Sequence, residues 1–317
     1  MGAVPYSPFG TRRRFLEGRR GVGWCRIGPR RAPFQLKPVA LPADVRGVTN
    51  PVQSLPAVTT ITPAPSLGLD GAATLAFQPA VDLATGRLLG FEALLRWRDS
   101  TGRDIPPATL IPWAESHGHM NELNAWVLSE ACAQAARWPS DLQLAVNCSV
   151  FQLHRGEAAM AAAAALEQSG LSPDRLTVEV TETSVADDLA AEDLHMMTRL
   201  GIQLTVDDVG EDWSVLENLR GCVVSTVKID ASLTAGLADP DGQSRATAET
   251  IVTLCRSLGI CTVAEAVETV EQVAILREIG AETAQGYFFS TPLTAEDAAE
   301  LAAMTPAPRF ALSAPPG

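Results

Sequence analysis

The sequence lacks the features that place a protein in a membrane or outside the cell. No apolar run approaches the roughly 18 residues that a membrane-spanning helix needs. No apolar stretch follows the N-terminal arginines, so these residues do not form a secretory signal. The six cysteines include no CxxC pair, which argues against a zinc ribbon or a disulfide framework. We therefore expect a cytoplasmic protein without a membrane segment.

Positive charge is also scarce, and it is unevenly distributed. The formal net charge is −13, yet residues 1–50 hold ten Arg and Lys against two acids, so the remainder carries about −21. An acidic body does not bind nucleic acid through a basic surface, and it must hold a phosphate ligand in another way. The only two lysines are Lys37 and Lys228, which draws attention to the single lysine of the body.

Composition divides the chain into three parts. Residues 1–72 are rich in Pro, Gly and Arg, and we expect a disordered segment and linker there. Residues 73–304 show regular apolar patterning and predict one folded domain. Residues 305–317 are expected to form a flexible tail.

Short apolar runs alternate with helical patterns throughout the predicted domain. The strand candidates are residues 75–81, 88–97, 142–149, 176–183, 203–210, 226–230, 261–268 and 284–290. Helical spacing of apolar residues marks, among others, Asn121–Trp138, Asp187–Leu200, Gln243–Leu258 and Val270–Ile279. Strands that alternate with helices predict a parallel sheet, and eight such units predict an α/β fold of the (β/α)8 TIM-like barrel type.

The first two strands depart from this alternation. Only residues 84–87 separate them, and they include Gly86. A parallel crossover needs a dozen or more residues, whereas a short turn with glycine makes a hairpin. We therefore expect the first strand to be antiparallel.

Polar residues end every strand candidate from the second onward. They are Glu92, Asn147, Glu179 with Glu182, Asp207 with Asp208, Lys228 with Asp230, Glu265 with Glu268, and Gln285. The C-terminal strand ends of a barrel share one rim, so these side chains are expected to gather there. Such a cluster either holds protons at raised pKa or binds a multivalent cation.

The chemistry of this set favours a hard cation. The ligand atoms are oxygens, which suit Mg²⁺, Mn²⁺ or Ca²⁺ better than zinc. The adjacent Asp207 and Asp208 could bridge two ions, and Lys228 would add a charge beside a reacting phosphate or water. A single acid after a strand is more often a helix cap or a solvated loop residue, but repetition at seven strand ends is not explained by capping. His117 and His119 are interpreted as surface residues.

Seven motifs in this order resemble the EAL domain, the bacterial cyclic di-GMP phosphodiesterase family, over roughly residues 73–303. They are "FQPAVDLATGRLLGFEALLRW", "NCS", "EVTET", "DDVG", "VKID", "AEAVE" and "QGYFFS". The resemblance implies a barrel with a reversed first strand that hydrolyses cyclic di-GMP to linear pGpG. It also implies Mg²⁺ or Mn²⁺ as cofactor, with two ions, inhibition by Ca²⁺, and a homodimer as a possible assembly.

The resemblance also implies roles for individual residues. The expected metal ligands are Glu92, Asn147, Glu179, Asp207, Asp208 and Glu265. The expected catalytic residues are Lys228, Glu265, Asp208 and Gln285. Gln78 and Arg96 resemble substrate contacts, and Glu182 and Glu268 resemble anchors of the loop after strand 203–210.

Two segments depart from the family pattern. The family reads "DDFGTGYSSL" where this chain reads "DDVGEDWSVL", which introduces Val209, Glu211, Asp212 and Trp213. The family motif "AEGVE" is "AEAVE" here, with Ala266 in place of glycine. Three functions remain open: a phosphodiesterase of reduced activity, a degenerate domain that binds cyclic di-GMP or a partner protein, and a different barrel enzyme or structural role.

Overall fold

Eight strands close into a barrel, as the sequence predicts. The computed structural model describes residues 71–313, except 154, 188, 211–223 and 305. Around the barrel the strands run in the order β1-β9-β8-β7-β6-β5-β4-β2, and a pairing of β1 with β2 closes the sheet. The barrel strands are β1 (Ala72–Asp82), β2 (Leu88–Arg98), β4 (Gln143–Asn147), β5 (Leu176–Thr181), β6 (Gln203–Val209), β7 (Thr226–Ile229), β8 (Cys261–Ala264) and β9 (Thr283–Gln285).

Strand β1 is reversed relative to the others. It pairs antiparallel with both β2 and β9, whereas the remaining barrel neighbours pair in parallel. The β1–β2 turn uses Gly86 at φ 72, a conformation that favours glycine. A Cβ at this position would lie 2.2 Å from the carbonyl oxygen of Phe310, and the Phe310 amide donates to the Gly86 carbonyl at 2.7 Å. The predicted hairpin is confirmed, and the segment around Phe310 lies directly against its turn.

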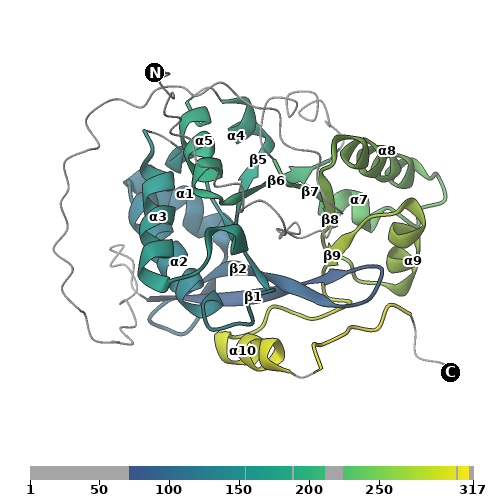
Figure 1. Ribbon diagram of the computed structural model, residues 1–317, viewed down its shortest axis with the longest axis horizontal. Helices are drawn as coiled ribbons and strands as arrows, with labels where there is room; N and C mark the ends of the chain where they lie inside the picture. The colour runs from purple at the N-terminus through teal and green to yellow at the C-terminus, as the bar shows by residue number, and fades with distance from the viewer. Residues whose placement is uncertain (1–70, 154, 188, 211–223, 305, 314–317) are drawn as a thin grey trace, which may run out of the picture.

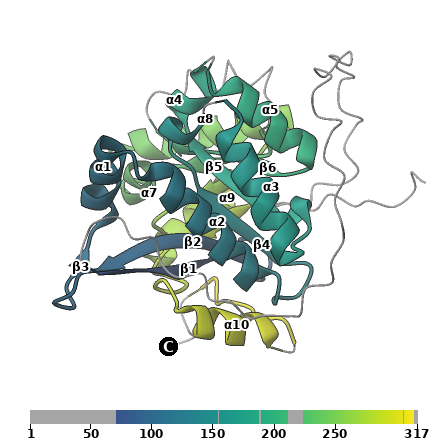
Figure 2. The same cartoon turned by 90° about the vertical axis from the view of Figure 1, so that its left-hand side faces the viewer.

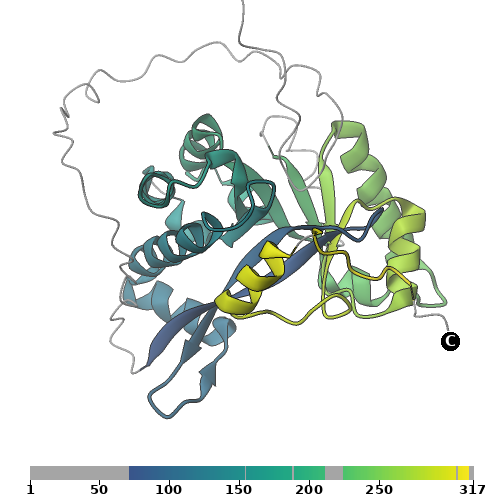
Figure 3. The same cartoon turned by 60° about the horizontal axis from the view of Figure 1, so that its bottom comes forward.

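Helices cover the outside of the barrel (Figure 1). They are α1 (Pro107–His117), α2 (Met120–Ala135), α3 (Glu157–Ser169), α4 (Glu182–Ala186), α5 (Ala191–Leu200), α7 (Ala231–Ala235), α8 (Gln243–Leu258), α9 (Val270–Ile279) and α10 (Ala295–Ala303). Figure 2 shows α2 and α3 side by side outside β4, and Figure 3 shows α10 along the β1–β2 hairpin. A two-residue strand, β3 (Asp104–Ile105), pairs antiparallel with the last two residues of β2. Within the described part of the chain, no helix has the length and apolarity to cross a bilayer.

The helix predictions agree with the structure to different degrees. The predicted bounds of α8 and α9 are confirmed, and α2 begins and ends slightly earlier than predicted. The helix predicted from Asp187 starts only at Ala191, because the Asp187 carboxylate accepts a hydrogen bond from the Leu189 amide at 2.8 Å. This local bond offers the backbone an alternative to the helix.

The interior of the barrel is polar directly below the rim. Thr177, Thr205, Thr226 and Thr283 each lie two residues before a predicted site residue, so they share its inward-facing side of the strand. All four are at most 1% exposed. The outward-facing residues of the same strands, such as Val178, instead join the apolar layer beneath the helices. Glu179, Asp207, Lys228 and Gln285 therefore project from above a buried threonine layer.

Candidate metal centre

The parallel strands bring the predicted polar residues to one end of the barrel. Asn147 and Gln285 are the last residues of β4 and β9, and Glu265 follows β8 directly. Glu179 pairs with Asn147 in the β4–β5 ladder, so both side chains project on the same side of the sheet. Glu92 pairs with Gln78 across the antiparallel β1–β2 ladder, which places Gln78 on the interior face as well.

Lys228 on β7 lies at the centre of this group. Its Nζ atom lies 2.6 Å from Glu265 Oε1 and 2.9 Å from Glu179 Oε2. The same atom lies 3.3 Å from both Glu92 Oε2 and Asp207 Oδ2. Four carboxylates, three on strands β2, β5 and β6 and one directly after β8, thus contact one ammonium group whose side chain is only 2% exposed.

Two amide side chains donate hydrogen bonds to carboxylates of this group. Gln285 Nε2 donates to Glu92 Oε2 at 2.7 Å and to Glu265 Oε1 at 3.0 Å. Asn147 Nδ2 donates to Glu92 Oε1 at 2.7 Å. Both oxygens of Glu92 are therefore engaged, and each of these bonds joins residues far apart in the sequence.

A break in the regularity of β6 brings two adjacent acids to the same place. Successive side chains of a regular strand point to opposite faces, which would separate Asp207 from Asp208. The β6–β7 ladder shifts register between Val206 and Val209, and Asp208 adopts φ 59. As a result, side-chain oxygens of Asp207, Asp208 and Glu265 lie within 4.8 Å of one another. The sequence shows the acid pair but not this irregularity.

Burial and mutual repulsion shift the pKa values of the carboxylates. Burial, with added repulsion from Glu92 and Asp207, raises the pKa of Glu179 well above its usual range despite Lys228. Burial raises the pKa of Glu265 to about 7, against the opposing effect of Lys228. Burial would also raise the pKa of Glu92, but Lys228 and the amide donors outweigh it and lower the pKa.

The pKa values of Lys228 and Asp208 are shifted by the same surroundings. Burial alone would lower the pKa of Lys228, yet the surrounding carboxylates raise it well above its usual value, so the group is a cation. Burial and the neighbouring Asp207 and Asp230 raise the pKa of Asp208. Asp230 itself caps α7, where its carboxylate accepts a hydrogen bond from the Ser232 amide at 2.8 Å. For this acid, the alternative that an acid after a strand serves as a helix cap is therefore correct.

The donor set fits a hard divalent cation. Its atoms are carboxylate and amide oxygens, and the acids that contact Lys228 outnumber this single cation four to one. Excess negative charge in a buried cluster is relieved by a multivalent ion or by protonation. Because four carboxylates surround one ammonium, the cluster is short of positive charge, and a bound cation would supply it.

Four predicted residues lie outside these contacts. Gln78 Nε2 donates to the Ser290 carbonyl at 2.5 Å, and Arg96 Nη1 donates to the Leu95 carbonyl at 2.9 Å. Glu182 is the first residue of α4 and is half-buried, and Glu268 is exposed before α9. The loop that these two acids are predicted to anchor, with its departures Glu211, Asp212 and Trp213, lies outside the described residues.

Ala266 is a feature whose conformation the sequence does not reveal. It follows Glu265 and adopts φ 50, in the left-handed region that disfavours residues with a Cβ. The next residue is fixed on both sides, because the Val267 amide donates to the Gln285 carbonyl at 3.0 Å and the Phe288 amide donates to the Val267 carbonyl at 2.8 Å. The turn that directs Glu265 inward is thus held by β9 and by the segment that follows it, and it carries backbone strain.

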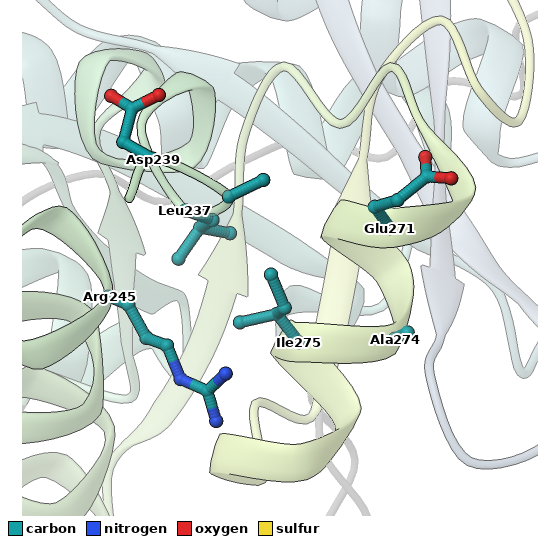
Figure 4. Close-up of a pocket in the computed structure, with 7 residues that line it drawn as sticks. Leu237, Asp239, Arg245, Glu271, Ala274 and Ile275 are labelled. Atoms are coloured by element: carbon teal, nitrogen blue, oxygen red, sulfur yellow. The ribbon is translucent and has the colours of Figure 1, made fainter. Parts of the chain in front are cut away.

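A separate cavity lies on the flank of the barrel (Figure 4). It measures about 430 Å³ and lies between the α7–α8 connection and α9. Its lining includes Leu237, Ile275 and Arg245, and none of the predicted site residues. The carboxylate cluster is therefore the better candidate for the functional site.

Comparison with known families agrees with this arrangement. The EAL domain family model matches residues 68–292. The chain belongs to the EAL domain family. EAL domains are metal-dependent, which matches the cluster of Asp207, Asp208 and Glu265.

Several relatives of this EAL domain are cyclic di-GMP phosphodiesterases. The chain is 31% identical over 283 residues to cyclic di-GMP phosphodiesterase PA2567 of Pseudomonas aeruginosa, covering 87% of this chain and 45% of the relative. It is 36% identical over 226 residues to cyclic di-GMP phosphodiesterase NbdA of the same organism, covering 69% and 29%. The chain thus spans less than half the length of these curated relatives.

Solved structures show the same barrel. The PaMucR phosphodiesterase in complex with c-di-GMP superposes with a TM-score of 0.67 at 33% identity, covering 71% of this chain and 93% of that one. Klebsiella pneumoniae BlrP1, in a calcium and cyclic di-GMP complex, gives a TM-score of 0.61 at 30% identity, covering 73% and 58%. These likenesses confirm the EAL barrel fold.

Proposed function

We propose that this EAL domain hydrolyses cyclic di-GMP to linear pGpG with Mg²⁺ or Mn²⁺. The observation that carries the proposal is the convergence of Glu92, Glu179, Asp207 and Glu265 on Lys228 at the C-terminal rim. Relatives that share the family and the barrel are named cyclic di-GMP phosphodiesterases. An acidic rim alone would repel a phosphodiester, so metal ions are required for this substrate to approach.

The same residues divide into two ligand groups. Glu92, Asn147, Glu179 and Asp207 would hold one ion, and Asp207, Asp208 and Glu265 would hold a second. Bound ions at such a site lower the pKa of water and neutralise charge on the phosphate. The grouping is supported by the short distances among Asp207, Asp208 and Glu265 and by the bond between Asn147 and Glu92.

The remaining residues of the cluster would act on protons and orientation. Lys228 Nζ would donate hydrogen bonds to the attacking water or the phosphate oxygens. Glu265, whose Oε1 lies 2.6 Å from Lys228 Nζ, would either help to hold the second ion or take the proton from water. Gln285 would hold the carboxylates of Glu265 and Glu92 in position, because its amide donates to both.

The outer residues would contact the substrate and the neighbouring loop. Gln78 lies beside Glu92 on the interior face, and Arg96 lies four residues farther along β2, so both suit contacts with the sugar-phosphate ring. Glu182 and Glu268 would anchor the loop of residues 211–223. We further propose that this loop slows turnover, and that strain at Ala266 contributes, because both depart from the family pattern near Asp208 and Glu265.

The decisive experiment is to incubate the purified chain with cyclic di-GMP and to separate pGpG from substrate. We expect product with Mg²⁺, more product with Mn²⁺, and none with a chelator or with Ca²⁺ alone. Glu278→Gln, in a surface ion pair on α9, is the matched control and should retain activity. Binding of cyclic di-GMP without any pGpG at millimolar Mn²⁺ would replace the enzyme by a receptor. Neither binding nor cleavage would leave a partner-protein role.

Three broader expectations accompany this proposal. The functional unit comprises residues 73–304, it resides in the cytoplasm, and it can form a homodimer. Light scattering of the purified chain measures the assembly, and cell fractionation measures the compartment. Neither result alters the assignment of the chemistry.

A further inference from the structure

The contacts of Lys228 exceed what one ammonium group can satisfy. A lysine ammonium has three N–H donors, whereas four carboxylates lie within 3.3 Å of Nζ. Two of the distances are short, to Glu265 and Glu179, and the other two are at the long end of hydrogen bonding. The single ammonium therefore cannot donate a hydrogen bond to each of the four acids at the same time.

The carboxylates have few other sources of positive charge. Gln285 and Asn147 contribute neutral amide donors, and among the described residues the four acids form ion pairs with Lys228 and with no arginine. Carboxylates that face one another in a buried site repel strongly when unpaired. Without the ammonium, Glu92, Glu179 and Asp207 would have to separate or take up protons.

We propose that Lys228 holds the four carboxylates together in the metal-free protein and that a divalent cation competes with it for the same oxygens. The inference rests on the metal site of the proposed function and adds a second role for Lys228, as a positioning residue. Every acid that contacts Nζ is also a proposed ligand, so an ion that binds the oxygens facing Nζ would displace the ammonium from them. Metal binding is then an exchange that shifts Lys228 away from at least part of the cluster.

This exchange has consequences for selectivity and stability. A monovalent cation carries the same charge as the ammonium it would displace and gains nothing by replacing it. A divalent cation brings twice the charge and accepts up to six oxygen ligands, so it satisfies acids that three N–H donors cannot. The metal-free barrel stays folded because the ligands are already gathered, and the metal affinity is lower than it would be without the lysine.

The scarcity of lysine allows a direct test on the unaltered chain. Selective labelling with ¹⁵N at lysine Nζ gives two ammonium signals, from Lys37 and Lys228, and Lys37→Arg assigns them. In chelator, the buried Lys228 signal should exchange its protons slowly with water. Saturating Mg²⁺ should move this signal and accelerate its exchange, while Na⁺ at equal ionic strength leaves it unchanged. Metal binding with no change in the Lys228 exchange rate would overturn the inference.

A substitution provides the second arm. Lys228→Met keeps most of the side-chain length and removes the charge, and it should lower the melting temperature in chelator by roughly 10 °C. The same variant should bind Mn²⁺ more tightly than wild type, on the order of tenfold. Arg245→Met, which breaks an exposed ion pair with Glu278, should alter neither quantity. Weaker or equal Mn²⁺ affinity in Lys228→Met would refute competition.

The two proposals fail in distinguishable ways. If Mg²⁺ and Mn²⁺ do not raise the melting temperature of the wild type, the metal site itself is absent and both proposals are overturned. If they raise it while Lys228 responds in neither arm, only the competition is overturned. If Lys228 responds but no pGpG forms, the exchange stands and the hydrolytic function is overturned.

Discussion

Two ion pairs of similar length show how little a distance says about energetics. Arg245 and Glu278 lie 2.8 Å apart on the flank of the barrel, with side chains 38% and 66% exposed (Figure 4 shows Arg245). Lys228 and Glu179 lie 2.9 Å apart at the rim, with side chains 2% and 3% exposed. Water screens the first pair, and such pairs contribute about 0–1 kcal/mol. Breaking a buried pair costs about 3–5 kcal/mol, because the remaining charge loses its partner without regaining water.

The two contacts also differ in how far they balance charge. The flank pair joins two helices and satisfies both partners. The rim cluster joins strands β2, β5, β6 and β7 with the residue after β8, and it leaves its acids short of positive charge. A group of charges that the protein itself does not balance points to an external cation, whereas a balanced surface pair does not.

The largest effect is expected from Asp207→Asn. Asp207 belongs to both proposed ligand groups, so the substitution should abolish stabilisation by Mn²⁺ and lower turnover on the order of 10³-fold. Asp141→Asn, in the partly exposed pair with Arg87, removes the same charge from a surface contact and should leave both unchanged. Thermal melts with and without Mn²⁺ measure the first effect and pGpG formation the second. Equal Mn²⁺ shifts in Asp207→Asn and wild type would contradict the assignment.

A smaller effect on turnover is expected from Lys228→Ala at saturating metal. Its proposed catalytic role lies in the chemical step, so kcat should fall about 100-fold while the affinity for cyclic di-GMP changes little. Steady-state kinetics and equilibrium binding separate the two quantities. A rise in Kd with unchanged kcat would instead make Lys228 a substrate-binding residue.

Removal of a supporting amide should cost less again. Gln285→Leu keeps the size but deletes the donor shared by Glu92 and Glu265, and it should lower Mn²⁺ affinity about 10- to 100-fold. Gln134→Leu deletes an amide that donates to Glu130 on the outer helix α2 and serves as control. Calorimetric titration with Mn²⁺ measures both variants, and indistinguishable affinities would show that Gln285 does not position the acids.

The smallest effect is expected from Ala266→Gly. Glycine relieves the left-handed strain at φ 50 but adds entropy to the unfolded chain, so the free energy of unfolding should rise by no more than about 1 kcal/mol. Ala246→Gly, on the exposed side of helix α8, has no such strain to relieve and should lower it by about 0.5–1 kcal/mol. Urea denaturation measures the free energy of unfolding of both variants and shows whether it rises in Ala266→Gly and falls in Ala246→Gly. A loss of stability in both would mean that Ala266 is not strained.

The barrel and the identity of its rim residues could be predicted from the sequence because each depends on local patterns. Alternation of apolar runs and helices fixes the order of elements, and the four residues before Leu88 are too few for a parallel crossover. The bond from Leu189 to Asp187 that delays α5 was not predictable, because many aspartates within helical patterns do not interrupt them.

The geometry of the centre could not be predicted for a different reason. The register shift that turns Asp208 toward Glu265 depends on pairing between β6 and β7, which the sequence of either strand does not show. The position of Lys228 among four acids requires the closure of the whole barrel. The left-handed turn at Ala266 depends on hydrogen bonds to β9, far along the chain.

The reversal of β1 determines where an upstream neighbour would attach. Because β1 runs antiparallel to β2, its first residue, Ala72, pairs with Arg98, beyond Glu92 at the end of the barrel that carries the carboxylates. In an all-parallel barrel the first strand would begin at the opposite end. A domain placed before such a barrel would therefore join it at the end that carries the carboxylates, whereas a domain placed before an all-parallel barrel would join it at the opposite end.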